Sequence, residues 1–171
     1  MSITVEIKGE DGHATIQVER YERLYTSNVD DANWLTGSVA IRAQEFSCQI
    51  DLSLRTDELA RFQADLHDCL KRLDGSATFS TLEQTLALKL EFGRRGGVSI
   101  TGSARSMRKT KTSMSFSFQS DQSALSETDG QLQHFIAQFP IRGDEMLSDV
   151  RSPIKIDQPP HRRGEMGRKG E

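Results

Sequence analysis

Apolar and polar residues alternate along most of the chain, which is the spacing of a β-strand with one side buried. The first two alternating segments flank Gly-Glu-Asp-Gly at residues 9–12, a sequence typical of a turn, and therefore predict a hairpin. The polar side chains between the apolar ones indicate a sheet with one face in water. In the first third of the chain, the predicted strands cover residues 3–7, 14–18, 35–43 and 46–54.

The spacing changes after Thr56, where apolar residues recur every three or four positions. This pattern predicts an amphipathic helix of about five turns. Thr56 is its expected N-cap, acidic Asp57 and Glu58 follow in the first turn, and Gly75 lies just past the end. The apolar stripe comprises Leu59, Phe62, Leu66, Cys69, Leu70 and Leu73.

Strand spacing then returns, interrupted by a glycine-rich turn at Gly93–Gly97. A second helix is expected after Asp121, ended by Pro140. The sequence shows no internal repeat. About seven strands and two helices, in the order ββββ-α-βββ-α, predict an antiparallel α+β fold. The later predicted strands cover residues 85–92, 98–100 and 113–119.

The C-terminal segment differs from the rest in composition. Residues 151–171 contain three of the four prolines and almost nothing apolar, with six Lys/Arg and three Asp/Glu, a net charge of +3. The rest then carries 16 Lys/Arg and 22 Asp/Glu, a net charge of −6. We expect one α+β domain at residues 1–148 and a disordered basic tail at 149–171, because such a tail buries too little to offset its ordering entropy.

Composition and motifs argue against several classes of protein. No signal peptide or membrane-spanning segment is recognisable, so we expect a cytoplasmic protein without a membrane partner. Cys48 and Cys69 make neither a disulfide framework nor a zinc site, and the polar residues around His67 are expected to be solvated on the helix surface. No nucleophile motif, metal motif or phosphate loop occurs, so we expect no enzyme, no cofactor and no metal.

The segment Asp30-Asp31-Ala32-Asn33-Trp34-Leu35 contains the only tryptophan and two adjacent carboxylates. Adjacent carboxylates can bind a cation or receive Arg and Lys side chains from a partner. A structural role is the alternative: an Asp or Asn caps the turn while Trp34 anchors the strand in the core.

A second feature is a group of basic residues in the second half of the chain. If they border one edge of a sheet, they form a positive patch on an acidic protein that contacts phosphates. The alternative is a solvated loop whose lysines protect an exposed strand edge, since no aromatic residue is interleaved for base stacking. The patch comprises Arg94, Arg95, Arg105, Arg108, Lys109 and Lys111.

In order along the chain, several segments resemble the WapI-type immunity protein family. The resemblance spans roughly residues 30–139 and excludes the N-terminal hairpin and the tail. It is carried by Asp31-Ala32-Asn33-Trp34-Leu35, residues 56–62, Glu83 before Leu86-Ala87-Leu88, residues 97–102 and residues 116–125.

The resemblance implies a bacterial protein that neutralises a cognate toxin by binding its catalytic domain. An acidic body suits a basic toxin, such as a nuclease. We expect the contact on exposed acids: Asp30, Asp31, Asp51, Glu83 and Glu91. The alternative hypothesis is an accessory or structural subunit of a larger assembly that contacts nucleic acid through the basic hairpin.

Overall fold

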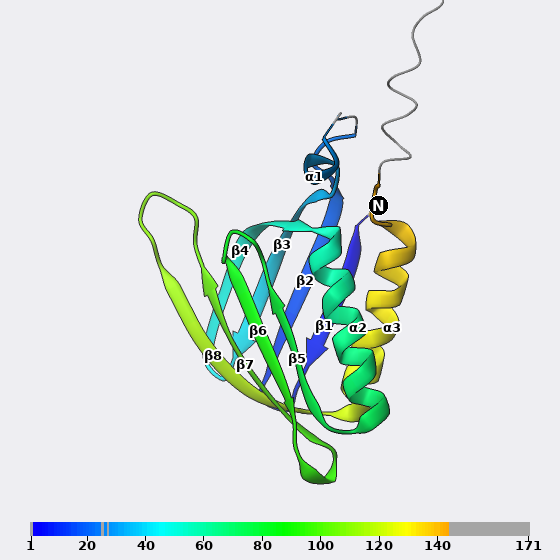
Figure 1. The fold of residues 1–171 in the computed structure, drawn as a ribbon. Helices are drawn as coiled ribbons and strands as arrows, with labels where there is room; N and C mark the ends of the chain where they lie inside the picture. Colours follow the sequence, from blue (N-terminus) through cyan, green and yellow to red (C-terminus); the bar gives the residue numbers. More distant parts are fainter. Residues whose placement is uncertain (1, 25, 27, 144–171) are drawn as a thin grey trace, which may run out of the picture.

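The computed structural model describes residues 2–24, 26 and 28–143, and Figure 1 shows their arrangement. Over these residues the chain forms two four-stranded antiparallel sheets and two long helices in the order ββββ-α-ββββ-α. The predicted α+β class is therefore confirmed, with eight strands in place of about seven. The predicted tail at 149–171 lies outside the described residues.

Each sheet is a simple meander in which consecutive strands pair. The first sheet contains β1 (Ile3–Lys8), β2 (Gly12–Tyr21), β3 (Trp34–Ala43) and β4 (Phe46–Arg55), with a short helix α1 (Val29–Ala32) before β3. The long helix α2 (Thr56–Arg72) follows β4. The second sheet contains β5 (Gly75–Ser80), β6 (Leu86–Phe92), β7 (Gly97–Arg105) and β8 (Ser113–Asp121), with a 3₁₀ turn η1 (Arg94–Gly96) before β7, and is followed by α3 (Gln122–Gln138).

The strand that sequence patterning missed is β5. Its segment Gly-Ser-Ala-Thr-Phe-Ser has only two buried apolar residues, Ala77 and Phe79, so its alternation is weak. With β5 in place, four strands and a 17-residue helix occur twice along the chain. What repeats is the order of strands and helices and not the amino-acid sequence, so the sequence shows no internal repeat.

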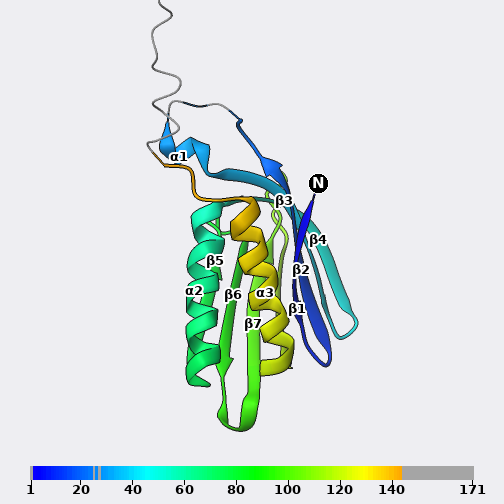
Figure 2. The same ribbon diagram turned by 90° about the vertical axis from the view of Figure 1, so that its right-hand side faces the viewer.

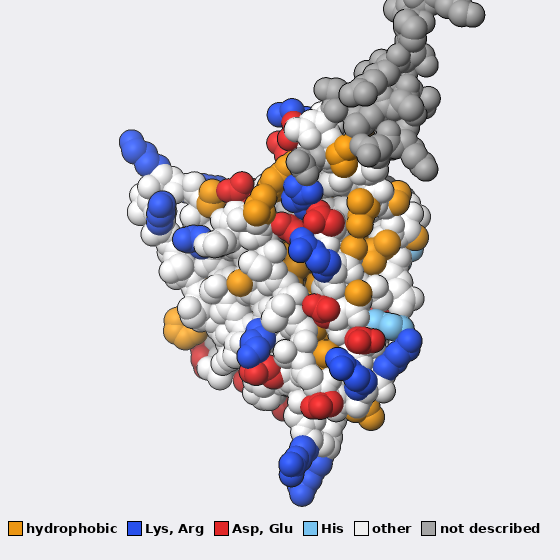
Figure 3. All heavy atoms as spheres, in the orientation of Figure 1, with side chains coloured by type: hydrophobic (Ala, Val, Ile, Leu, Met, Phe, Trp, Pro, Cys, Tyr) orange, Lys and Arg blue, Asp and Glu red, His pale blue; other side chains and the backbone are white. Residues whose placement is uncertain are grey.

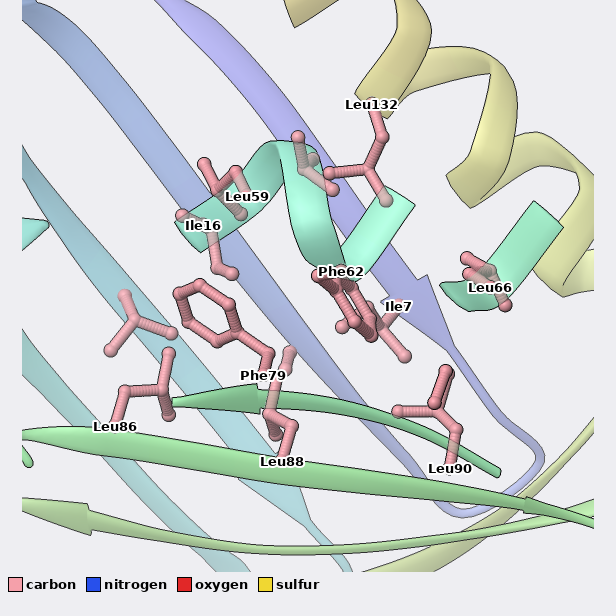
Figure 4. Packing of buried hydrophobic residues seen from close by; sticks show 14 of the residues in the cluster. Ile7, Ile16, Leu59, Phe62, Leu66, Phe79, Leu86, Leu88, Leu90 and Leu132 are labelled. Carbon is pink, nitrogen blue, oxygen red and sulfur yellow. The ribbon is translucent and has the colours of Figure 1, made fainter. Parts of the chain in front are cut away.

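The inner faces of both sheets and one side of each long helix share one hydrophobic cluster. Helix α2 lies along β5, α3 lies along β1, and the two helices pack against each other, as Figure 2 shows. The helices thus close the side of the core that lies between the edge strands β1 and β5. Figure 4 shows Phe62 of α2 against Phe79 of β5, with ring centroids 5.7 Å apart.

Helix α3 also satisfies the backbone of the edge strand β1. The Gln131 Oε1 accepts the Glu6 N–H at 2.6 Å, and the Thr128 hydroxyl donates to the Glu6 carbonyl oxygen at 2.6 Å. These two side chains replace the partners that a further strand would provide, which protects the edge from pairing with another chain.

A buried carboxylate joins the two long helices. Asp129 of α3 accepts hydrogen bonds from the side-chain amides of Gln63 (2.9 Å) and Gln133 (3.0 Å). Its other contact is the His67 Nδ1, at 2.9 Å. The prediction of a solvated segment thus holds for Asp65 and Asp68, which are exposed, whereas the side chain of His67 is 40 % exposed and also contacts α3. The sequence does not show which helix faces will meet, so this contact was not predicted.

The helix ends agree with the prediction in part. Asp121 caps α3 by accepting the Ala124 N–H at 2.9 Å, and Pro140 follows its end. Thr56 is not the cap of α2 but its first residue; its hydroxyl donates to the Asn33 carbonyl oxygen at 3.5 Å. At the other end, Leu73 adopts the left-handed conformation (φ 56°) that precedes β5.

The regular alternation of β4 does not translate into uniform burial. Leu52 and Leu54 are buried, whereas Phe46 at the start of the strand is 69 % exposed. Phe46 lines an open groove together with Met114 and Phe116 of β8. The apolar face of β4 thus extends beyond the core into this groove.

Candidate partner-binding surface

Trp34 lies at one end of the first sheet, next to the short helix α1. It begins β3 and pairs in register with Arg55, the last residue of β4. Leu35 faces the core and is fully buried, so the side chain of Trp34 faces outward and is half-buried. The Arg55 guanidinium lies 5.8 Å from the centre of the Trp34 ring. The alternative in which Trp34 anchors the core is therefore wrong.

An open hollow of about 260 Å³ lies beside Trp34. Its lining combines the end of β2, the short helix α1, β4 and the turn between β5 and β6. The residues that line it are Glu22, Arg23, Asp31, Trp34, Ser53 and Glu83. Because three of the six are acidic and one is basic, the hollow is negative overall.

The three carboxylates differ in their surroundings. Asp31 accepts a hydrogen bond from the Arg23 Nη1 at 3.0 Å, as an ion pair. Glu22 and Glu83 are exposed, and neither makes an ion pair with another described residue. Two carboxylates beside an aromatic ring can receive an Arg or Lys side chain from a partner, by charge-assisted hydrogen bonds and by stacking.

A buried glutamate holds the turn that carries Glu83. Glu58 of α2 accepts the Leu82 N–H at 2.7 Å through Oε1 and the Arg55 N–H at 2.9 Å through Oε2. Burial raises the pKa of Glu58, and the two N–H donors offset part of this effect. Glu58 therefore joins the start of α2 to the β5–β6 turn and places Glu83 next to the hollow.

Asn33, which precedes Trp34, connects α1 to the chain beyond α3. Its side chain is bonded to the Val29 carbonyl oxygen in α1 and to the backbone of Arg142 beyond α3. Arg142 in turn stacks on Tyr21, 3.3 Å from the ring centre, and donates to the Arg23 carbonyl oxygen at 3.1 Å. The chain that follows α3 thus fixes α1 and the end of β2 in place.

Exposed apolar side chains lie at the same end of the molecule. Leu82 (64 % exposed) precedes Glu83, and Ile141 (54 %) precedes Arg142. Leu24 (65 %) accepts a hydrogen bond from Arg142 through its carbonyl oxygen. Apolar side chains surrounded by charged groups are the usual composition of a protein–protein interface.

The structure brings together some of the acids predicted from sequence. Asp31 and Glu83 both line the hollow, and exposed Asp51 lies on the outward side of β4, two residues before Ser53. Glu91 lies near the far end of β6 on the other sheet, where it pairs with Lys89 at 2.7 Å. Asp30 lies in α1, but its side chain is not among those described.

Sequence reasoning missed Glu22. Its backbone N–H donates to the Trp34 carbonyl oxygen at 2.8 Å, so its place beside the tryptophan follows from the pairing of β2 with β3. The sequence would have indicated this position if the predicted strand at residues 14–18 had been extended to residue 21 and paired with the strand at residues 35–43.

The six predicted basic residues do not form one patch. Arg94 and Arg95 lie in the turn before β7, whereas Arg105, Arg108, Lys109 and Lys111 lie at its end and in the following loop. The nine-residue strand β7, which spans about 30 Å, runs from one group to the other.

The described part of the chain also lacks the features of two other kinds of site. Residues 2–24, 26 and 28–143 contain no group of three or more His, Cys, Asp or Glu side chains that could hold a metal ion. Across the same residues, no helix is long and apolar enough to cross a membrane.

The fold and the charged hollow describe an α+β protein with a surface suited to binding another protein. The model of the Immunity protein WapI-like family matches residues 6–140, and the chain belongs to this family. The match extends the resemblance recognised from sequence to include most of the N-terminal hairpin. No curated protein matches the chain.

Several solved structures resemble the chain, among them the following two. One is described as the structure of the plant transcriptional regulator PBF-2, with 9 % identity, a TM-score of 0.49, and coverage of 85 % of this chain and 92 % of that one. The other is WHY1 from Arabidopsis thaliana, with 13 % identity, a TM-score of 0.45, and coverage of 95 % and 98 %. Because both TM-scores are below 0.5, neither likeness supports a conclusion about function.

Proposed function

We propose that this protein neutralises a cognate bacterial toxin by binding it directly, without catalysis, through the surface around Trp34. Membership of the immunity family supports a role in toxin immunity. The observation that favours this surface is the hollow in which Asp31 and Glu83 meet beside Trp34.

The electrostatics favour a basic partner. Glu22 and Glu83 are exposed carboxylates without an ion pair among the described residues, and Asp51 lies close by on β4. Arg and Lys side chains of a partner would form ion pairs with these carboxylates and accelerate association. A nuclease domain, which carries positive charge to bind its substrate, fits this description.

The direct test begins with recovery of the tagged 171-residue chain from its host at low salt. A protein that co-elutes in an amount equal to that of the chain is identified by mass spectrometry. It is then produced separately, and this preparation is the purified partner. We expect the purified partner to arrest growth when expressed alone, and co-expression of the chain to restore growth.

A complex must then form from the two purified proteins alone. Restored growth together with a one-to-one complex in gel filtration would support the proposal. If growth is restored without a complex, or if no protein co-elutes, the proposal of neutralisation by direct binding is wrong.

A further inference from the structure

The loop between β7 and β8 is the most basic part of the described chain. No Asp or Glu occurs between Glu91 and Asp121, and the loop contains Arg108, Lys109 and Lys111 within four residues. All three side chains are exposed, and none pairs with an acid among the described residues. Figure 1 shows the loop extending outward from the second sheet at the upper left, and Figure 3 shows Lys and Arg side chains gathered there.

The loop has a defined base. The Ser106 N–H donates to the Thr112 carbonyl oxygen at 2.8 Å and closes the loop above the last pair of the two strands. Met107 beside the cations is 64 % exposed. The loop therefore presents an apolar side chain and three cations on a base fixed by the sheet.

The base of this loop touches the turn that carries Glu83. The Arg105 N–H donates to the Thr85 carbonyl oxygen at 2.8 Å, and its guanidinium donates to the Gln84 carbonyl oxygen at 3.1 Å. The acidic hollow and the basic loop are thus neighbours at one end of the molecule. The other basic turn, with Arg94 and Arg95, lies at the opposite end of β7.

We infer that the β7–β8 loop is a second contact with the same partner and seats against an acidic site on it. A complementary surface must then carry a basic area, facing the Trp34 hollow, beside an acidic one, facing the loop. This inference rests on the proposed function and adds to it the charge pattern of the partner.

An acidic protein site fits the loop better than nucleic acid does. The loop has no aromatic side chain on which a base could stack. Glu83 lies beside its base, and Asp31 and Glu22 lie in the same hollow, so a phosphate backbone that runs past the loop would meet negative charge.

The test compares two charge-removing variants of the 171-residue chain, one with three substitutions and one with two. Arg108→Gln/Lys109→Gln/Lys111→Gln removes the charge of the loop, and Arg94→Gln/Arg95→Gln removes charge at the other end of β7. Because all five side chains are exposed, both variants should unfold at the wild-type temperature. Titration calorimetry with the purified partner then gives each dissociation constant, and a 20-nucleotide single-stranded RNA serves as the phosphate probe.

We expect the loop variant to bind the purified partner at least tenfold more weakly, with a smaller dependence on salt, while the Arg94/Arg95 variant binds like wild type. Equal affinity of the loop variant and wild type would overturn the inference. The inference would also be overturned if the wild-type chain bound the RNA and the loop variant did not. If Asp31→Lys/Glu83→Lys weakens binding while the loop variant does not, the second contact fails and the proposed function stands.

Discussion

The side chain of Asn33 pairs with both backbone polar groups of Arg142. Its Oδ1 accepts the Arg142 N–H at 2.8 Å, and its Nδ2 donates to the Arg142 carbonyl oxygen at 3.0 Å. Asn33 is 2 % exposed, and its own carbonyl oxygen accepts the Thr56 N–H at 3.0 Å. One residue therefore connects α1, the start of α2 and the chain beyond α3.

Replacing Asn33 with alanine removes these bonds and leaves the partly buried backbone groups of Arg142 without partners. We expect Asn33→Ala to lower the free energy of unfolding by about 2–4 kcal/mol, measured by urea denaturation. Gln49→Ala, at an exposed position of β4, is the control and should change it by less than about 0.5 kcal/mol. A similar small effect of both substitutions would show that the Asn33 bridge does not hold this end together.

The two ends of β4 should differ in their contribution to stability. Leu54 is fully buried, so Leu54→Ala should cost about 2–5 kcal/mol of unfolding free energy. Phe46 is 69 % exposed, so Phe46→Ala should cost less than about 1 kcal/mol, although it removes a larger side chain. Chemical denaturation of the two variants checks this, and an equal loss in both would mean that the groove at Phe46 is closed in solution.

The protection of β1 by α3 predicts a change in solubility as well as in stability. Gln131→Met keeps the length of the side chain but leaves the Glu6 N–H without its acceptor, which should cost about 1–2 kcal/mol. The freed strand edge should also increase association between copies of the chain, visible by light scattering. Gln138→Met, an exposed position on the same helix, should do neither. Unchanged scattering by Gln131→Met would show that this bond does not guard the edge.

Glu58 gives a pH dependence of known sign. Burial raises its pKa above the usual 4.5, so the folded state binds the proton more tightly than the unfolded state does. Its contribution to stability is therefore largest below the unfolded pKa and is lost as pH rises through the raised folded pKa.

Glu58→Gln removes this titration. The unfolding free energy of wild type minus that of Glu58→Gln should fall between pH 4 and pH 7, in urea titrations at constant ionic strength. A difference that grows over this range would mean that the N–H donors from Arg55 and Leu82 outweigh burial, and that the folded pKa lies below the usual value.

Strand and helix periodicity predicted the fold class and most elements, because apolar and polar side chains alternate regularly along β1 to β4. It missed β5, where Ala77 and Phe79 give only two apolar positions, and it left open whether Trp34 anchors the core or faces a partner, because a single aromatic residue at the start of a strand is compatible with both. The outward direction of Trp34 follows from the neighbouring Leu35, which takes the inward position at the start of β3.

The candidate site was less accessible to sequence reasoning. Asp31 and Glu83 are 52 positions apart and meet only because the β5–β6 turn lies against the start of α2, through Glu58. Glu91 has the same charge, yet it lies near the end of β6 that is remote from the β5–β6 turn, and it pairs with Lys89. Exposure and charge alone do not distinguish these acids, because the distinction depends on contacts between distant segments.

The most direct test of the account is the affinity of charge-reversed variants for the purified partner, measured by titration calorimetry at low and physiological salt. We expect Asp31→Lys/Glu83→Lys to weaken binding by at least about a hundredfold at low salt, and Glu91→Lys to bind within about twofold of wild type. Wild-type affinity of the Asp31→Lys/Glu83→Lys variant, or an equal loss in Glu91→Lys, would contradict the placement of the partner at the Trp34 hollow.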